Sequence, residues 1–291
     1  MMLGHTAGLA EAAAEVAAAE VAAAEMAAGL AIQVPTANIL GILFSLAVAW
    51  GIPFLLMAVI RRRWRADIFP FVLGCGSFFL FAMLLEQMLH MAVLLRMGSF
   101  SELLRENLWL YALYAGAAAG IFEETGRFLT MRIFMKKNLT RENALMYGAG
   151  HGGMEAVLIL GVASINNLVN ALLLNSGALM ESLASDPNAR QALEALSPLG
   201  TLPAWQFFLG GGERISAIAL QIALSLFVYR AVKDRRKWFF YPLAILIHGA
   251  LDMAVVLAAN HGWLVQAELI TLAGTLAVSW AAWRFAWKGG E

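Results

Sequence analysis

Cysteine pairs, a net charge and a basic surface rich in aromatic residues are all missing from this 291-residue sequence. Lys and Arg total 20, as do Asp and Glu, and no basic stretch is interleaved with aromatic residues as nucleic-acid binding would require. We therefore expect no nucleic-acid partner. The single cysteine, Cys75, cannot form an intramolecular disulfide and stands in an apolar stretch, which favours a role in packing.

Apolar residues make up most of the chain. They account for 61% of the sequence, charged residues account for 14%, and the mean hydropathy is +0.71. This composition is typical of multi-pass membrane proteins. A bilayer core needs about 20 apolar residues per helix, and seven segments are long enough: 36–60, 68–95, 108–135, 143–174, 204–230, 239–259 and 263–286. The predicted fold is an all-α, polytopic transmembrane bundle of about seven helices (six to eight).

Basic residues follow every second predicted helix and so predict the orientation. They gather in "RRRWR" (61–65), "KKNLTR" (136–141) and "KDRRK" (233–237), and again at Arg284 and Lys288. Cytoplasmic loops of membrane proteins are enriched in Lys and Arg. We expect a multi-pass integral protein of a bacterial plasma membrane, with its N-terminus outside and its C-terminus in the cytoplasm.

Residues 1–35 differ in composition from the rest of the chain. They are rich in alanine and glutamate, and they lack the cationic start of a signal peptide. We interpret them as a low-complexity extension and residues 36–288 as the transmembrane domain. Residues 175–203 contain "SDPNAR" and two more prolines, which predicts a polar external loop with a short helix.

Several predicted spans contain charged residues, which are costly inside a bilayer and therefore suggest function. Three spans each hold two such residues four positions apart, on one helix face. These pairs are Glu123 and Arg127, His151 and Glu155, and His248 and Asp252. With a rise of about 1.5 Å per residue, antiparallel helices place all three pairs at one depth. The doublet Glu123–Glu124 adds a carboxylate that one arginine cannot neutralise.

Each group also has a purely structural interpretation. The doublet with Arg127, like Glu213 with Arg214, would then form an ion pair inside the bundle. Glu86 and His90 on the second span are interpreted as a supporting polar pair. The expected occurrence of two histidines and several carboxylates at one depth argues instead for a functional site. Such side chains bind zinc and leave room for a water molecule, and another carboxylate nearby can act as general base.

Four motifs carry a resemblance to a known family. They are "GIFEETGRFL" (120–129), "YGAGHGGMEAVLILG" (147–161), "GGERISAIALQIALSLFVY" (211–229) and "LIHGALD" (246–252). In this order they resemble the YhfC family of intramembrane metalloproteases and, more distantly, the CAAX-protease and bacteriocin-processing superfamily.

The resemblance implies a catalytic glutamate at Glu123 or Glu124, and a metal or oxyanion centre built from His151, His248 and Asp252. Two features depart from expectation. The arginine comes three residues after the second glutamate, as in the YhfC pattern, and not four as in the wider superfamily. Gln221 stands where we expect a histidine, and glutamine neither titrates nor binds zinc well.

The predicted function is an intramembrane peptidase that acts on membrane-associated peptides or proteins. His151 and His248, with Asp252 or Glu155, would hold zinc, and the centre would open toward the cytoplasm. Glu124 or its neighbour Glu123 would move the proton, and Arg127 would orient that glutamate.

Two alternatives stay open. An ion-coupled transporter also uses buried carboxylates and histidines, but the sequence shows no internal repeat. A catalytically silent scaffold or immunity-type protein would keep the polar centre for structure, and Gln221 favours it slightly.

Overall fold

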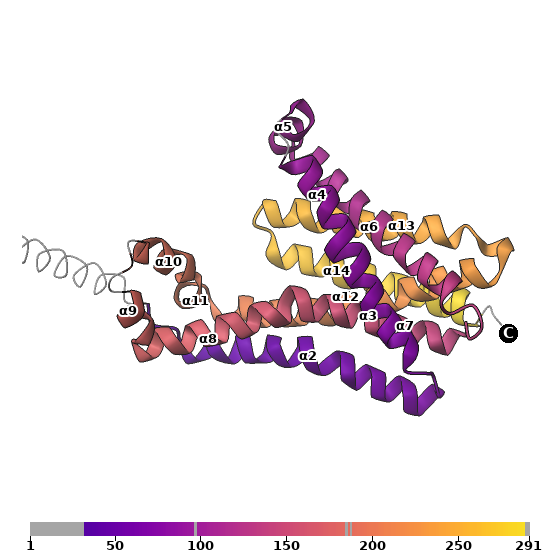
Figure 1. Ribbon diagram of the computed structural model, residues 1–291, viewed down its shortest axis with the longest axis horizontal. Helices are drawn as coiled ribbons and strands as arrows, with labels where there is room; N and C mark the ends of the chain where they lie inside the picture. Colours follow the sequence, from indigo (N-terminus) through magenta and orange to yellow (C-terminus); the bar gives the residue numbers. More distant parts are fainter. Residues whose placement is uncertain (1–31, 96–97, 184–185, 187, 289–291) are drawn as a thin grey trace, which may run out of the picture. The chain divides into compact units, whose positions relative to one another are not determined.

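The computed structural model describes residues 32–95, 98–183, 186 and 188–288 (Figure 1). Within these residues the secondary structure is helical, with no strand. Helix α2 begins at Thr36, directly after the predicted extension. Most of that extension, residues 1–31, lies outside the described residues, so its interpretation stays a prediction.

The helices follow one another with short connections. In chain order they are α2 (Thr36–Trp64), α3 (Phe69–Phe78), η1 (Phe79–Glu86), α4 (Gln87–Leu94), α5 (Ser99–Glu106), α6 (Leu108–Ile133), α7 (Arg141–Ala156), η2 (Val157–Gly161), α8 (Val162–Ser176), α9 (Ala178–Leu183), α10 (Ala189–Leu196), α11 (Pro198–Thr201), α12 (Ala204–Lys233), η3 (Arg235–Lys237), α13 (Phe240–Asn260), α14 (Leu264–Ala281) and η4 (Ala282–Trp287). The segments η1, η2 and η4 are π-helical turns that continue the preceding α-helices.

Six helices in the described part of the chain are long and apolar enough to cross a membrane. They are Thr36–Trp64, Phe69–Leu94, Arg141–Ser176, Ala204–Lys233, Arg235–Asn260 and Leu264–Trp287. The remaining predicted span, 108–135, exists as the 26-residue helix α6, but it is not among these six. It contains Glu123, Glu124 and Arg127, which lower its apolarity. The prediction of a polytopic helical bundle is confirmed, and six of its spans meet the criteria of length and apolarity.

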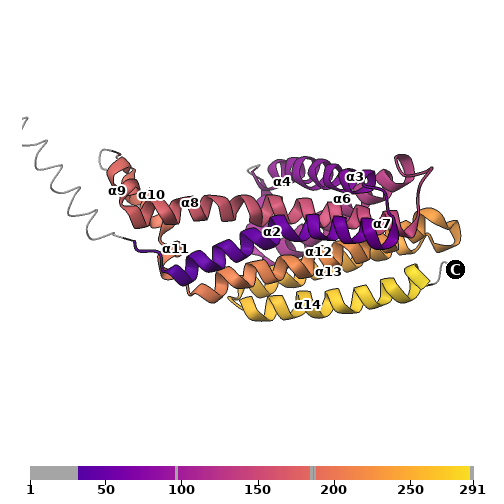
Figure 2. The same ribbon diagram turned by 90° about the horizontal axis from the view of Figure 1, so that it is seen from below.

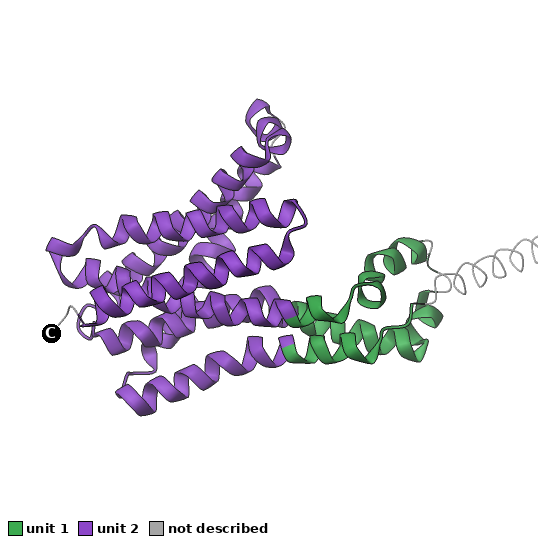
Figure 3. Cartoon of the chain, turned by 180° about the vertical axis from the view of Figure 1, so that it is seen from behind, with its two compact units in different colours: residues 1–44, 163–208 green, residues 45–162, 209–291 purple. Residues whose placement is uncertain are grey.

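The chain divides into two compact units (Figure 3). Unit 1 comprises residues 1–44 and 163–208, and its core includes Val34, Ile42 and Leu199. Asn38 connects its parts, because the side-chain amide donates to the carbonyl oxygens of Leu199 and Leu202, each at 2.9 Å. The predicted polar loop at 175–203 contains three short helices, α9, α10 and α11.

Unit 2 comprises residues 45–162 and 209–291 and holds the bundle that carries the polar residues. Within it α6 runs along α13, and α3 runs along α7 (Figures 1 and 2). At the first of these contacts, Gly116 and Gly249 face each other so closely that a Cβ atom added at Gly249 would lie 2.7 Å from the carbonyl oxygen of Gly116. Small residues of this kind let membrane helices approach closely.

Candidate functional site

Glycines on α7 place His151 in the middle of unit 2. A Cβ atom added at Gly152 would lie 2.9 Å from Cβ of Gln221 on α12, and one added at Gly150 would overlap the backbone of Phe71 on α3. The backbone of α7 therefore touches two other helices on either side of the histidine. Close backbone contact leaves His151 fully buried, at 0% exposure. The glycines on either side of His151 allow neighbouring helices to approach this closely, which explains why the stretch around the histidine is rich in glycine.

Glu123 on α6 faces both buried histidines. Its Oε2 atom lies 2.9 Å from Nε2 of His151 and 3.9 Å from Nε2 of His248. The side-chain amide of Gln221 donates to the same oxygen at 3.1 Å. Three helices other than α6 therefore converge on one carboxylate oxygen.

Glu124, the second member of the doublet, points to different partners. Its Oε1 atom lies 2.9 Å from Nδ1 of His248, and its Oε2 atom lies 3.0 Å from Nε of Arg127. With Nδ1 held by Glu124, the other ring nitrogen of His248 faces Glu123 and also Asp252, whose Oδ2 atom is 3.5 Å away. Glu124 and Arg127 are both fully buried, so each provides the compensating charge that the other needs inside the bundle.

Arg127 and Gln221 join the glutamates to α12. The guanidinium donates to the backbone carbonyl of Gln221 at 2.6 Å, to the side-chain oxygen of Gln221 and to the hydroxyl of Ser225. The amide of Gln221 donates to Glu123 and, at 2.7 Å, to Glu155. Gln221 therefore occupies the centre of the polar network, with its amide group orienting three charged side chains.

Glu155 joins this network through Gln221 and Arg214. Its Oε1 atom accepts a hydrogen bond of 3.0 Å from Nη1 of Arg214, and Arg214 also pairs with Glu213. Across the described residues no hydrogen bond or ion pair joins Glu155 to His151 or His248. The local charge balance is thus two carboxylates around one arginine.

The three pairs predicted from i, i+4 spacing have different outcomes. Arg127 pairs with Glu124 at i, i+3 and not with Glu123. The pair on α7 shares a helix, but its members contact different helices. Only the pair on α13, His248 with Asp252, lies within the reach that its spacing predicts. The structure brings all three pairs into a single polar network, and the expectation of one common depth in the bilayer stays a prediction.

A second polar group adjoins this network on η1 and α4. Nε2 of His90 lies 3.2 Å from Oε1 of Glu86, and Nδ1 of the same ring lies 2.9 Å from the hydroxyl of Tyr114 on α6. This is the supporting pair predicted from the sequence, with Tyr114 as an added partner. Glu86 ends the π-helical turn η1, and such turns recur near functional sites.

The donors in the centre fit zinc by their chemistry. Imidazole nitrogens and carboxylate oxygens are its usual ligands, and a carboxylate on the far nitrogen, as Glu124 is on His248, orients a ring for metal binding. Tetrahedral zinc separates its ligand atoms by about 3.3 Å, against 3.5 Å between His248 and Asp252. Nδ1 of the buried His151 has no hydrogen-bond partner. As they stand, however, no three His, Cys, Asp or Glu side chains of the described chain are arranged to hold a metal ion.

Comparison with known proteins places the chain in a family. A profile of the YhfC intramembrane metalloproteases matches residues 48–273. The chain belongs to this family. A membrane protein of Bacillus subtilis (strain 168), described as the uncharacterized membrane protein YhfC, is 41% identical to it over 239 residues, which cover 80% of this chain and 91% of that protein. No solved structure matches.

The match to the YhfC family includes every residue of the polar network. The family's name agrees with the resemblance drawn from the four sequence motifs, and a membrane-protein relative agrees with the six apolar helices. Ser225 and Tyr114 were not predicted as members of the site from the sequence. Ser225 follows Gln221 by one helical turn on α12, so its spacing offered a signal. Tyr114 offered none, because its partner His90 lies on another helix.

Proposed function

We propose that this YhfC family member is an intramembrane peptidase and that Glu123 is its general base. The observation that supports this is the position of one carboxylate oxygen, Oε2 of Glu123, against the imidazoles of His151 and His248 in a buried site. A carboxylate in such a place accepts a proton from an attacking water and returns it to the leaving amine. Glu124 is less suited, since both of its oxygens already have partners, His248 and Arg127.

The same geometry suggests separate roles for the neighbouring side chains. Glu124 holds the ring of His248 through Nδ1, and Arg127 offsets the charge of Glu124. Gln221 fixes one oxygen of Glu123 by donating to it at 3.1 Å. These contacts keep the base in one orientation before substrate arrives, and preorganised polar groups of this kind act strongly where water is excluded.

We assign zinc, the metal implied by the family, to His151, His248 and Asp252. When bound, it would act as a Lewis acid toward the peptide carbonyl. Asp252 is the most accessible of the three, with 38% of its side chain exposed, while both histidines are almost fully buried. We assign Glu155 to neutralising Arg214, because it contacts that arginine and neither histidine.

The basic ends of two helices support a proposed orientation in the membrane. We propose a bacterial plasma-membrane protein with its N-terminus outside, its C-terminus in the cytoplasm, and a centre that opens toward the cytoplasm. Arg61, Arg62 and Arg63 end α2, and Arg230 and Lys233 end α12. Positive charge at these ends favours the cytoplasmic side. A reporter domain that is active only in the cytoplasm should be active when fused to the C-terminus, and one that is active only outside the membrane should not.

The proposed base is tested by comparing cleavage products in membranes. Cells lacking their own copy would express the wild type, Glu123→Gln or the control Glu102→Gln, which changes an exposed glutamate on α5. New protein N-termini in the membrane fraction would be identified by mass spectrometry. We expect them with the wild type and the control and not with Glu123→Gln, with equal membrane insertion of all three. Unchanged products from Glu123→Gln would refute the assignment.

The metal is tested by elemental analysis of the purified protein. We expect about one zinc per folded chain, lost in His248→Ala and retained in Glu123→Gln, because only the first change removes a ligand. A folded wild type without zinc would contradict the metal assignment and leave hydrolysis to the glutamates alone.

One observation favours a second candidate function. Gln221 stands at the centre of the network in place of the expected histidine, and its amide occupies one oxygen of Glu123. A catalytically silent scaffold would keep this network for structure. It would retain its effect in the cell when Glu123 is changed to Gln.

A further inference from the structure

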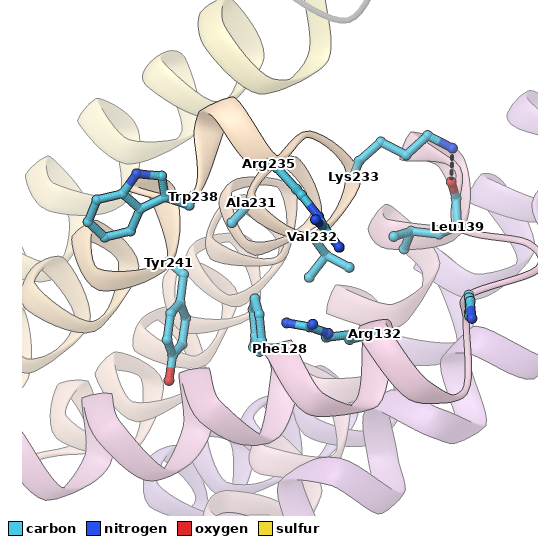
Figure 4. A pocket seen from close by; sticks show the side chains of 10 residues that line it. Phe128, Arg132, Leu139, Ala231, Val232, Lys233, Arg235, Trp238 and Tyr241 are labelled. Atoms are coloured by element: carbon cyan, nitrogen blue, oxygen red, sulfur yellow. Dashed lines mark hydrogen bonds between the residues drawn. The ribbon is translucent and has the colours of Figure 1, made fainter.

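A cavity separate from the polar centre lies at one end of unit 2 (Figure 4). Its volume is about 770 Å³. It is formed where α6 ends, α12 ends and α13 begins. The residues that line it are Phe128, Arg132, Lys136, Leu139, Ala231, Val232, Lys233, Arg235, Trp238 and Tyr241.

The charge of this cavity has one sign. Four of the residues that line it are basic and none is acidic. Lys233 donates to the backbone carbonyl of Leu139 at 3.0 Å, and in the described part of the chain no carboxylate forms an ion pair with Arg132, Lys136 or Arg235. The nearby carboxylate of Asp234 instead accepts from a backbone amide of η3. Among the described residues, the cavity therefore has cations without an ion-pair partner.

The walls of the cavity are aromatic and held in place. The rings of Phe128 and Tyr241 are stacked with their centroids 4.6 Å apart, and the hydroxyl of Tyr241 lies 2.8 Å from that of Thr125. The guanidinium of Arg132 lies 5.6 Å from the centre of the Phe128 ring. Figure 4 shows Arg132 and Arg235 reaching toward the same space from α6 and η3. The cavity therefore offers both apolar contact and positive charge.

The place of the cavity identifies the kind of ligand. It lies at the ends of membrane-spanning helices, where tryptophan and tyrosine mark the boundary between hydrocarbon and water, and Trp238 is 66% exposed there. Basic pockets between helix ends on the cytoplasmic side of a membrane, where the proposed orientation puts this cavity, suit anionic headgroups. We propose that the cavity binds the phosphate-bearing headgroup of an anionic lipid, with Arg132 and Arg235 on the phosphate and the aromatic walls against the glycerol and upper acyl chain.

This proposal goes beyond peptide hydrolysis and does not depend on it. Thr125, which contacts Tyr241, directly follows Glu124 in α6, so a headgroup held here would lie next to the helix that carries both glutamates. A bound headgroup would fix the depth of that helix in the bilayer. Lipid binding is measured without any cleavage assay, so the failure of one proposal leaves the other standing.

The experiment is native mass spectrometry of the full chain in detergent, with lipid titrated in. The probes are phosphatidylglycerol, phosphatidylcholine and inorganic phosphate. Each basic residue near an anionic headgroup is worth about a fivefold change in affinity, so Arg132→Gln/Arg235→Gln should bind phosphatidylglycerol about thirtyfold more weakly. The matched control Arg62→Gln/Arg63→Gln removes two exposed cations from the end of α2 and should bind like the wild type.

A charge-preserving variant, Arg132→Lys/Arg235→Lys, separates loss of binding from loss of folding and should keep most of the affinity. Equal losses in the cavity variant and the α2 control would overturn the site in favour of general surface charge. Equal binding of phosphatidylcholine and phosphatidylglycerol would overturn the preference for anionic lipid. Inorganic phosphate that displaces the lipid at equal concentration would overturn the lipid as ligand.

Discussion

Arg127 offers the sharpest test of how the polar centre is held together. Its guanidinium is fully buried, pairs with Glu124 at 3.0 Å and donates to the backbone carbonyl of Gln221 at 2.6 Å. Arg127→Met keeps the volume and removes the charge, which leaves Glu124 as a buried carboxylate without its cation. Breaking a buried ion pair from one side costs about 3–5 kcal/mol. We expect a loss of that size in the free energy of unfolding.

The double variant Glu124→Gln/Arg127→Met removes both charges and should recover about half of the loss, since only hydrogen bonds of about 1 kcal/mol each stay broken. Arg132→Met, on an exposed position of the same helix, serves as control and should change stability by less than about 0.5 kcal/mol. The assay is unfolding of the purified protein in mixed micelles, followed by the fluorescence of its 9 tryptophans. A double variant no more stable than Arg127→Met would refute the reasoning, because uncompensated charge would then not be the cause.

Two further predictions concern close contacts and unit 1. Gly152→Ala should destabilise the bundle by about 1–3 kcal/mol in the same unfolding assay, because the new methyl group has no space beside Gln221; Gly76→Ala, with open space at its Cβ position, is the control, and equal effects would contradict this account. Asn38→Ala should leave two carbonyls without donors and cost about 2 kcal/mol. Hydrogen exchange should then speed up in α11 and not in α13, and unchanged exchange in α11 would count against the role of Asn38.

The membrane-spanning helices were predictable because length and apolarity decide them. Six of the seven predicted spans correspond to apolar helices, and the remaining one, 108–135, is helix α6 at the predicted position. Helix α6 is not among the apolar helices because it contains Glu123, Glu124 and Arg127, the residues predicted to be functional. The short helices between residues 175 and 203 were harder to foresee, because their stability comes from packing in unit 1, as for the buried Leu193 on α10.

The members of the polar network were predictable, and their pairing was not. Charges inside membrane spans are few, so His151, His248 and the two glutamates stood out from the sequence. Spacing along one helix says nothing of what the neighbouring helix presents. Arg214, on α12, is the partner of Glu155 on α7, and no count of residues within either helix would have joined them.

The role of Gln221 also could not be predicted from the sequence, because it depends on contacts with other helices. Viewed by itself it was a departure from an expected histidine. In the structure its amide has the donors and the acceptor needed to serve Glu123, Glu155 and Arg127 together. A neutral side chain with both kinds of group suits a position between charges of opposite sign.

The glycine contacts of α7 also bear on how the chain enters the membrane. The segment that carries His151, "YGAGHGGMEA", is weakly apolar, and its lasting place depends on backbone contact with α3 and α12. The apolar residues of the continuous span Arg141–Ser176 lie mainly after Glu155, in η2 and α8. During synthesis, partition into lipid should therefore be driven by the second half of this span. We expect the histidine end to become stable only after α12 has been made, which ends about 80 residues after His151.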